Sequence, residues 1–190
     1  MSISRQSLLL LTVESVAIFL SVLLAFFVEE WRDDRREIRQ MQEALAVISH
    51  ELQSNAAEIE QTLPFHRESL PIVVEQVEAL ANGGDFPGPG EIRFANAPVL
   101  STAAYSMAVN TGALERAPTD ALIAISLAYQ RIGQVDRVSI SLAERNAQVR
   151  YNDGVRYLSG FVYFYGSIIS TEEAALSTIA QARAAIEQAQ

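Results

Sequence analysis

One apolar run constrains this chain more than any other feature. Between Leu8 and Val28 there is a single charged residue, Glu14. As an α-helix these roughly 21 residues would rise about 30 Å, which is the thickness of the hydrocarbon core of a bilayer. The run is longer than the apolar part of a typical signal peptide, and no small-x-small cleavage motif follows it. We therefore expect residues 1–30 to form an uncleaved transmembrane anchor.

Insertion of this anchor is expected to be favourable despite the acid. The Leu, Ile, Phe and Val residues of the run contribute roughly −7 kcal/mol on the translocon scale, and one buried acid takes back about 3 kcal/mol. A membrane-interface group is predicted directly after the run: Trp31, Arg32, Arg35 and Arg36, with Arg39 close behind. Because the positive-inside rule counts arginines, it places the rest of the chain in the cytoplasm.

One side of the anchor helix is predicted to pack against another helix. A helical wheel gathers Glu14, Ala17, Ser21 and Ala25 on this side. Small residues four apart allow two helices to approach closely in lipid, and a carboxyl group is costly when it faces lipid. The partner would be a second copy of this chain or another membrane protein. Alternatively, Glu14 extends toward the membrane interface near Arg5.

The helix is predicted to continue beyond the membrane as a stalk. No Gly or Pro interrupts the chain before Pro64, and the charged segment Glu29–Arg39 is expected to be supported by the ion pairs Glu29–Arg32 and Asp33–Arg36. Apolar residues then recur with a mean spacing of about 3.5 residues, which is typical of a helix packed along its length. This stripe comprises Ile38, Met41, Leu45, Ile48, Leu52, Ala56, Ile59 and Leu63.

Pro64 is expected to end the stalk, because the residue before a proline disfavours helical geometry. A second helix, starting at Pro64 or at Ser69, would return antiparallel and complete a stalk hairpin over residues 31–82. Asn82-Gly83-Gly84 is a signal for the end of this helix, and residues 83–100 are expected to form a loop.

Residues 101–190 are predicted to supply the other helices of an all-α bundle, so that residues 31–190 form one domain. The apolar pattern and the capping residues indicate four segments: a short helix Ser101–Asn110 with Ser101 as its cap, a long helix from Thr119 toward Tyr151, a buried core helix Tyr157–Ile169, and a last helix capped by Ser170 or Thr171.

The composition excludes several kinds of chemistry. Without cysteine there are no disulfides or thiolates, and 23 acids against 14 bases argue against a nucleic-acid partner. Neither His50 nor His66 has a second nitrogen ligand at metal-binding spacing. The stalk carboxylates Glu51, Glu58 and Glu60 have the pattern of a solvated face. Tyr105 and Asn110 are expected to hydrogen-bond inside the bundle, and we expect no cofactor, no metal and no catalytic residue.

Two stretches of this chain resemble a family of uncharacterised bacterial single-span proteins. The first runs from Glu14 through Trp31 to Arg36 and combines an early Glu, an apolar span, a Trp and a charged helix. The second is Ala103–Leu114, which contains a Gly-Ala-Leu turn and is followed by Pro118. The resemblance implies a single-pass protein of the bacterial inner membrane with a helical domain, and it implies no particular activity.

Three functions are compatible with these features. The favoured one is a membrane-anchored helical scaffold or interaction protein that self-associates through its span and stalk, with the lipid bilayer as its constant partner. The second is a membrane sensor or regulator in which Glu14 responds to protonation, ions or lipid state. The third is an enzyme that uses a groove in the bundle, which is disfavoured because no catalytic constellation is visible.

Overall fold

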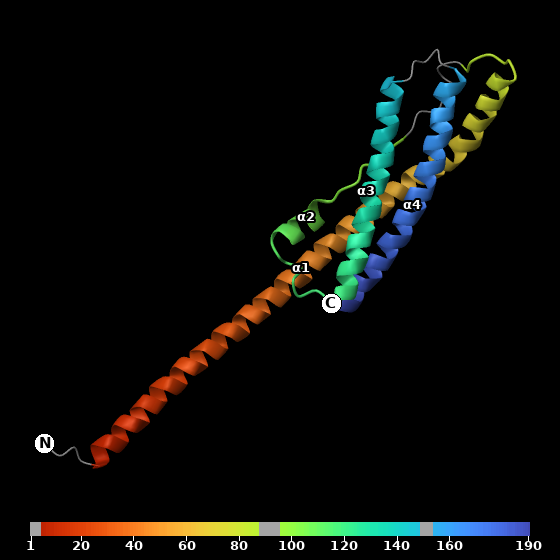
Figure 1. Cartoon of the computed structure of the whole chain (residues 1–190). Helices are drawn as coiled ribbons and strands as arrows, with labels where there is room; N and C mark the ends of the chain where they lie inside the picture. The colour runs from red at the N-terminus through yellow and green to blue at the C-terminus, as the bar shows by residue number, and fades with distance from the viewer. Residues whose placement is uncertain (1–4, 88–95, 149–153) are drawn as a thin grey trace.

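A computed structural model describes residues 5–87, 96–148 and 154–190, with the side chains of residues 5–13, 15–17 and 142–148 excluded. These ranges contain four α-helices and no strand (Figure 1). The all-α prediction is therefore confirmed. The helices are α1 (Arg5–Ala81), α2 (Ala103–Asn110), α3 (Thr119–Gln148) and α4 (Val155–Ala189).

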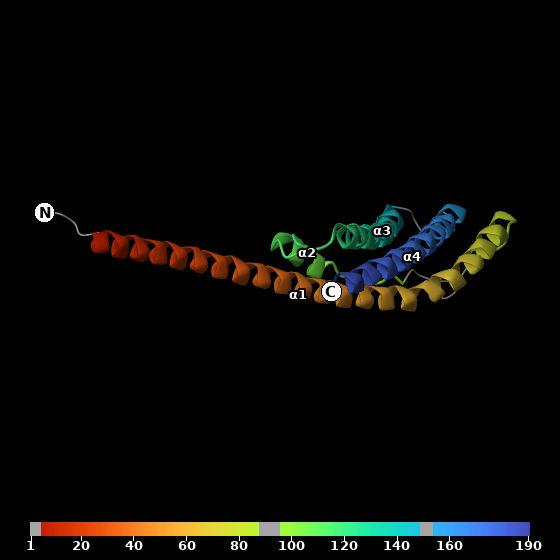
Figure 2. The ribbon, with the colours of Figure 1, turned by 90° about the horizontal axis from the view of Figure 1, so that it is seen from below.

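The bundle forms around the C-terminal half of α1. α4 packs against both α1 and α3, and it runs antiparallel to each of them (Figure 1). The short α2 lies beside α1 near the place where α1 leaves the bundle (Figure 2). The N-terminal part of α1 projects beyond the other helices as a rod in both views. Within the described part of the chain, no helix has a stretch that is both long and apolar enough to cross a membrane.

The predicted apolar stripe of α1 is confirmed from Met41 onward. Leu45, Ile48 and Leu52 are completely buried, whereas Ile38 is 40% exposed because it lies just beyond the bundle. α3 contributes Ile125, Ile132 and Val135 to the same core, and the predicted core segment of α4 contributes Phe161, Phe164, Tyr165 and Ile168. The α-helical period therefore located core residues of α1 and α3, and the segment of α4 that was predicted to be a core helix is buried on one side, with Tyr163 exposed.

The predicted stalk hairpin is wrong, because α1 continues through Pro64 and Pro71 to Ala81. A proline inside a helix removes one backbone hydrogen bond and bends the helix, at a cost of about 3 kcal/mol or more. Both prolines are exposed, and Figure 2 shows α1 curving alongside α4 in this region. The inner face of the bend buries His66, Ser69 and Val73, so tertiary packing offsets the cost and α1 stays continuous.

The predicted break at Ser170 or Thr171 is also wrong, since α4 is one helix. Both hydroxyls donate to the carbonyl of Ser167, one turn earlier, at 3.0 Å. Such bonds occur inside helices as well as in caps.

Other predicted helix ends agree with the structure. α1 ends before Gly83, whose φ is +85°, and α2 ends before Gly112, whose φ is +70°. Glycine tolerates this left-handed conformation better than other residues. α3 begins at the predicted Thr119, and the predicted extension of this helix to Tyr151 lies outside the described residues.

Candidate functional site

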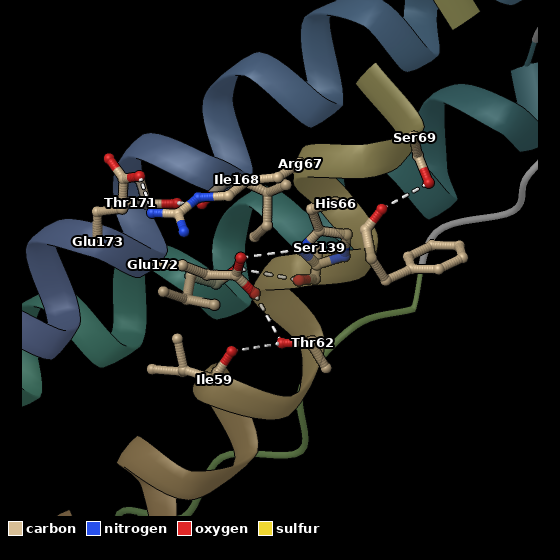
Figure 3. A network of polar contacts seen from close by, with 12 residues as sticks. Ile59, Thr62, His66, Arg67, Ser69, Ser139, Ile168, Thr171, Glu172 and Glu173 are labelled. Atoms are coloured by element: carbon tan, nitrogen blue, oxygen red, sulfur yellow. Dashed lines mark hydrogen bonds and ion pairs between the residues drawn. The ribbon is translucent and has the colours of Figure 1, made fainter. Parts of the chain in front are cut away.

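A fully buried polar network joins α1 to α4 beside the bend in α1 (Figure 3). His66 Nδ1 lies 2.9 Å from Glu172 Oε2, and the Thr62 hydroxyl donates to Glu172 Oε1 at 2.9 Å. The side chains of His66 and Glu172 are both 0% exposed. A carboxylate and an imidazole removed from water in this way interact far more strongly than a surface pair.

Aromatic rings and an outer ion pair surround this network. Three aromatic rings lie around His66, with their centroids 5.8–5.9 Å from the centroid of its imidazole: Phe65, Phe164 and Tyr165. The centroids of Phe65 and Tyr165 are 6.5 Å apart. Nearer the surface, Arg67 donates to Glu173 at 2.6 Å, and both of these side chains are exposed. The exposed Arg67–Glu173 pair therefore lies next to the buried His66–Glu172 pair and joins the same two helices, α1 and α4 (Figure 3).

The chemistry open to this network is limited by its burial. Histidine and glutamate are common acid–base catalysts, but a catalytic base must reach a proton of the substrate directly or through one water. His66 and Glu172 have no exposed surface, so this geometry fits a structural role. The network fixes the register of α4 on α1 at the bend, and no local sequence pattern indicated the pairing of His66 with Glu172.

A second polar centre, built on Glu51, attaches α2 to α1 and α3. One carboxylate oxygen accepts hydrogen bonds from the Ser101 hydroxyl at 2.6 Å and the Ala104 amide at 2.9 Å. The other accepts from the Tyr129 hydroxyl at 2.6 Å and the Tyr105 amide at 3.5 Å. Thr102, the cap residue of α2, makes no side-chain capping bond. Glu51 therefore caps α2 from another helix, and its predicted place on a solvated face is wrong.

Two tyrosines complete this centre. The ring of Tyr105 stacks on that of Tyr129 with a centroid distance of 4.4 Å, and the predicted hydrogen bond of its side chain inside the bundle stays a prediction. Asn110 is exposed, and the predicted hydrogen bond inside the bundle is wrong for it.

Burial raises the pKa of Tyr129 far above its ordinary value, and the hydrogen bond from its hydroxyl to Glu51 adds to this effect. Partial burial also acts to raise the pKa of Glu51, but the four hydrogen bonds outweigh it and hold the pKa below the ordinary 4.5.

Replacing Glu51 with glutamine is expected to lower the free energy of unfolding at neutral pH by about 1–2 kcal/mol, because charge-assisted bonds become neutral ones. Since the pKa of Glu51 is lower in the folded state, its stabilisation is complete above the unfolded-state pKa of about 4.5 and disappears as the pH falls through the folded-state value. Denaturation of both proteins at a series of pH values should show their difference shrinking below about pH 4.5.

Glu60→Gln is the matched control, because Glu60 is exposed on the same helix. It should leave the stability unchanged at every pH. A difference between the wild type and Glu51→Gln that stays constant from neutral to strongly acidic pH would contradict the assigned role of the carboxylate.

The residues predicted to meet the membrane lie on the projecting part of α1. Trp31 is 59% exposed, and the guanidinium carbon of Arg35 lies 5.1 Å from the centre of its ring. Arg32 and Arg36 are exposed as well. The predicted pairs Glu29–Arg32 and Asp33–Arg36 do not form in this described segment, because an exposed pair gains little against the loss of side-chain freedom.

The predicted packing face of the anchor points away from the bundle. Glu14, Ser21 and Ala25 are exposed, and the side chain of Ala17 lies outside the described residues. At 100° per residue, this face is about 150° around α1 from the buried stripe at Met41–Leu52. A second helix therefore has room to approach, and self-association through this face stays a prediction.

Sequence reasoning missed most of the residues that organise the bundle. Glu51 was predicted to lie on a solvated face, and the sequence predicted neither the pairing of His66 with Glu172 nor a role for Arg116. Among the described residues, no three histidine or carboxylate side chains gather closely enough to hold a metal ion.

No protein-family model matches this chain, nor does any curated protein or solved structure. The family resemblance therefore stays a prediction, and function has to be argued from geometry.

Proposed function

We propose that this protein is a membrane-anchored helical module, in which the N-terminal part of α1 holds the bundle at a membrane surface. One observation carries the proposal: large apolar side chains stand exposed along the projecting rod. Between Ile18 and Val28 nearly every residue is a large apolar one, and Phe19, Leu24 and Phe27 are each more than 60% exposed.

The distribution of these side chains around the helix favours lipid over a protein groove. At 100° per residue, the exposed apolar positions from 18 to 28 surround the whole circumference of α1. A helix that docks on a protein surface is apolar on one side only, whereas a helix that is apolar all round belongs in a protein core or a membrane. Contiguous exposed apolar surface of this extent marks an interaction site.

The boundary of the rod supports the same proposal. Trp31 stands where the apolar segment ends, followed at once by exposed arginines. Tryptophan and arginine are the residues that settle at the membrane–water interface, and the arginines favour the cytoplasmic side. The bundle beyond them would act as an anchored scaffold. The buried networks at Glu172 and Glu51 serve this function by keeping the bundle rigid.

The double substitution Leu20→Asp with Leu24→Asp is expected to release the protein from membranes. Each aspartate at the centre of a span raises the free energy of insertion by about 3 kcal/mol. The two aspartates and Glu14 then cost about 9 kcal/mol in all, which exceeds the roughly −7 kcal/mol that the apolar run contributes. We expect at least a tenfold fall, to order of magnitude, in the fraction that resists an alkaline carbonate wash.

The matched control is Ile123→Asp with Leu127→Asp, since these side chains have the same spacing and comparable exposure on α3. This variant should stay in the washed membranes. The proposal fails if wild-type protein is removed by the wash, or if both double variants behave alike.

A further inference from the structure

The charged segment of α1 from residue 29 to residue 39 separates its charges by sign. At 100° per residue, its four arginines lie within an arc of about 100° centred roughly 160° away from the buried stripe. We name this surface the arginine face: Arg32, Arg35, Arg36 and Arg39. The five acids lie outside this arc. Glu30, Asp34 and Glu37 are within about 50° of the buried stripe, Asp33 is about 90° from it, and Glu29 lies about 20° beyond the arginine arc, next to Arg36.

Contacts with the bundle strengthen this separation. Arg116, in the connection between α2 and α3, donates to Asp34 at 2.6 Å and to Glu37 at 2.5 Å. Two of the five acids therefore share one guanidinium from the bundle side, which balances one of their two negative charges. In the described part of the chain, no guanidinium of the arginine face forms an ion pair with a carboxylate, and all four are exposed. The outward side of the segment is therefore positively charged.

We propose that the arginine face binds the headgroups of anionic phospholipids, an inference that rests on the proposed function. The guanidinium group is planar and offers paired donors that match phosphate oxygens. From residue 32 to residue 39 the face extends about 10 Å along the axis, which is comparable to the headgroup layer of one leaflet. It begins directly after the exposed apolar segment that ends near Trp31, so the membrane surface brings phosphates to it.

This continuity favours lipid over an acidic protein as the partner. An acidic protein segment would have to find the face by diffusion, whereas anionic lipids surround it permanently once the rod is embedded. Clusters of four or more arginines or lysines beside a membrane-inserted helix are typical of anionic lipid binding. The apolar ring of Trp31 between Arg35 and the apolar segment suits the same interface.

Trp31 also provides the measurement, because it is the only tryptophan of the chain. Full-length protein is reconstituted into vesicles of phosphatidylcholine and phosphatidylglycerol at one fixed ratio. Bromine atoms, which quench tryptophan, are placed either on the phosphatidylglycerol or on an equal mole fraction of the phosphatidylcholine. We expect quenching to be about twofold or more stronger with the brominated anionic lipid, and this preference to weaken with salt.

The test variant is Arg32→Gln with Arg36→Gln and Arg39→Gln, which keeps Arg35 against the Trp31 ring. It should quench equally with both brominated lipids. The matched control removes three exposed arginines from the bundle, through Arg131→Gln, Arg137→Gln and Arg156→Gln. This control should keep the wild-type preference for the anionic lipid.

The outcomes separate this proposal from the proposed function. If neither brominated lipid quenches Trp31, the rod is not embedded and the proposed function fails. If both lipids quench the wild type equally, the rod is embedded but the lipid preference is refuted. A preference that survives the triple substitution, or that the control also loses, overturns the assignment to this face. Equal quenching combined with loss of self-association in the triple variant would assign the face to an acidic protein segment instead.

Discussion

Replacing Glu172 with leucine is expected to lower the free energy of unfolding by about 3–5 kcal/mol, the usual cost of leaving one member of a buried polar pair without its partner. The loss leaves the His66 imidazole buried against aromatic rings with its Nδ1 partner gone, and it leaves the Thr62 hydroxyl without this acceptor. The measurement is denaturation of the full-length protein in detergent, followed by the loss of helical circular dichroism. His66→Leu should cost a similar amount, because it leaves the carboxylate unpaired.

The double variant His66→Leu with Glu172→Leu should recover most of this loss. Apolar groups that replace both members of a buried pair are often neutral or even stabilising. Without coupling the two single costs would add to about 6–10 kcal/mol, so a double-mutant cycle from the four proteins should give a coupling energy of at least about 4 kcal/mol. The control is Glu173→Leu, which breaks the exposed pair with Arg67 on the neighbouring surface and should cost less than about 1 kcal/mol.

Two results would contradict this role for the buried pair. One is a single variant at His66 or Glu172 that unfolds like the wild type. The other is a double variant whose cost equals the sum of the two single costs, because additive effects mean that the groups do not interact.

The sequence predicted the parts of the fold that depend on periodic burial. The spacing of Leu45, Ile48 and Leu52 is set by the helical repeat, and burial of that stripe in the structure follows from it directly. Phe161 and Tyr165 lie in the segment of α4 that was predicted to be a core helix from its apolar residues, and both are completely buried. In these segments the local pattern and the tertiary contacts require the same conformation, so the pattern is sufficient.

The predicted breaks failed where tertiary contacts outweighed local preference. Pro64 disfavours a helix through itself and through the preceding residue, yet the buried face that includes His66 and Val73 continues across it. Ser170 and Thr171 are good caps, but their hydroxyls bond to carbonyls of the preceding turn. A single sequence shows the local cost of continuing a helix and does not show the packing that compensates for it.

The polar networks had no local signal at all. Glu172 lies 106 residues from His66 and 110 from Thr62 in the chain, and Arg116 lies 79 residues from Glu37. Each of these side chains is of a type that is usually exposed. Only the assembled bundle reveals which of them are paired, and a pattern within a short window cannot indicate a partner so far away.

One leucine-to-alanine substitution placed at two positions of α1 should give opposite results. Leu52 is completely buried in the bundle, whereas Leu24 is 65% exposed on the rod. Leu52→Ala is expected to cost about 2–5 kcal/mol, from the lost burial and the cavity that remains. Leu24→Ala should change the free energy of unfolding of the bundle by less than about 0.5 kcal/mol. Denaturation in detergent measures both values under the same conditions.

This contrast tests whether α1 serves two environments along one continuous helix. The two leucines are the same residue type on the same helix, so only their surroundings differ: Leu52 is completely buried and Leu24 is largely exposed. A cost at Leu24 equal to that at Leu52 would mean that the rod folds against the bundle, and the proposed anchor would then lack its free apolar surface. A negligible cost at Leu52 would instead remove the core on which the bundle depends.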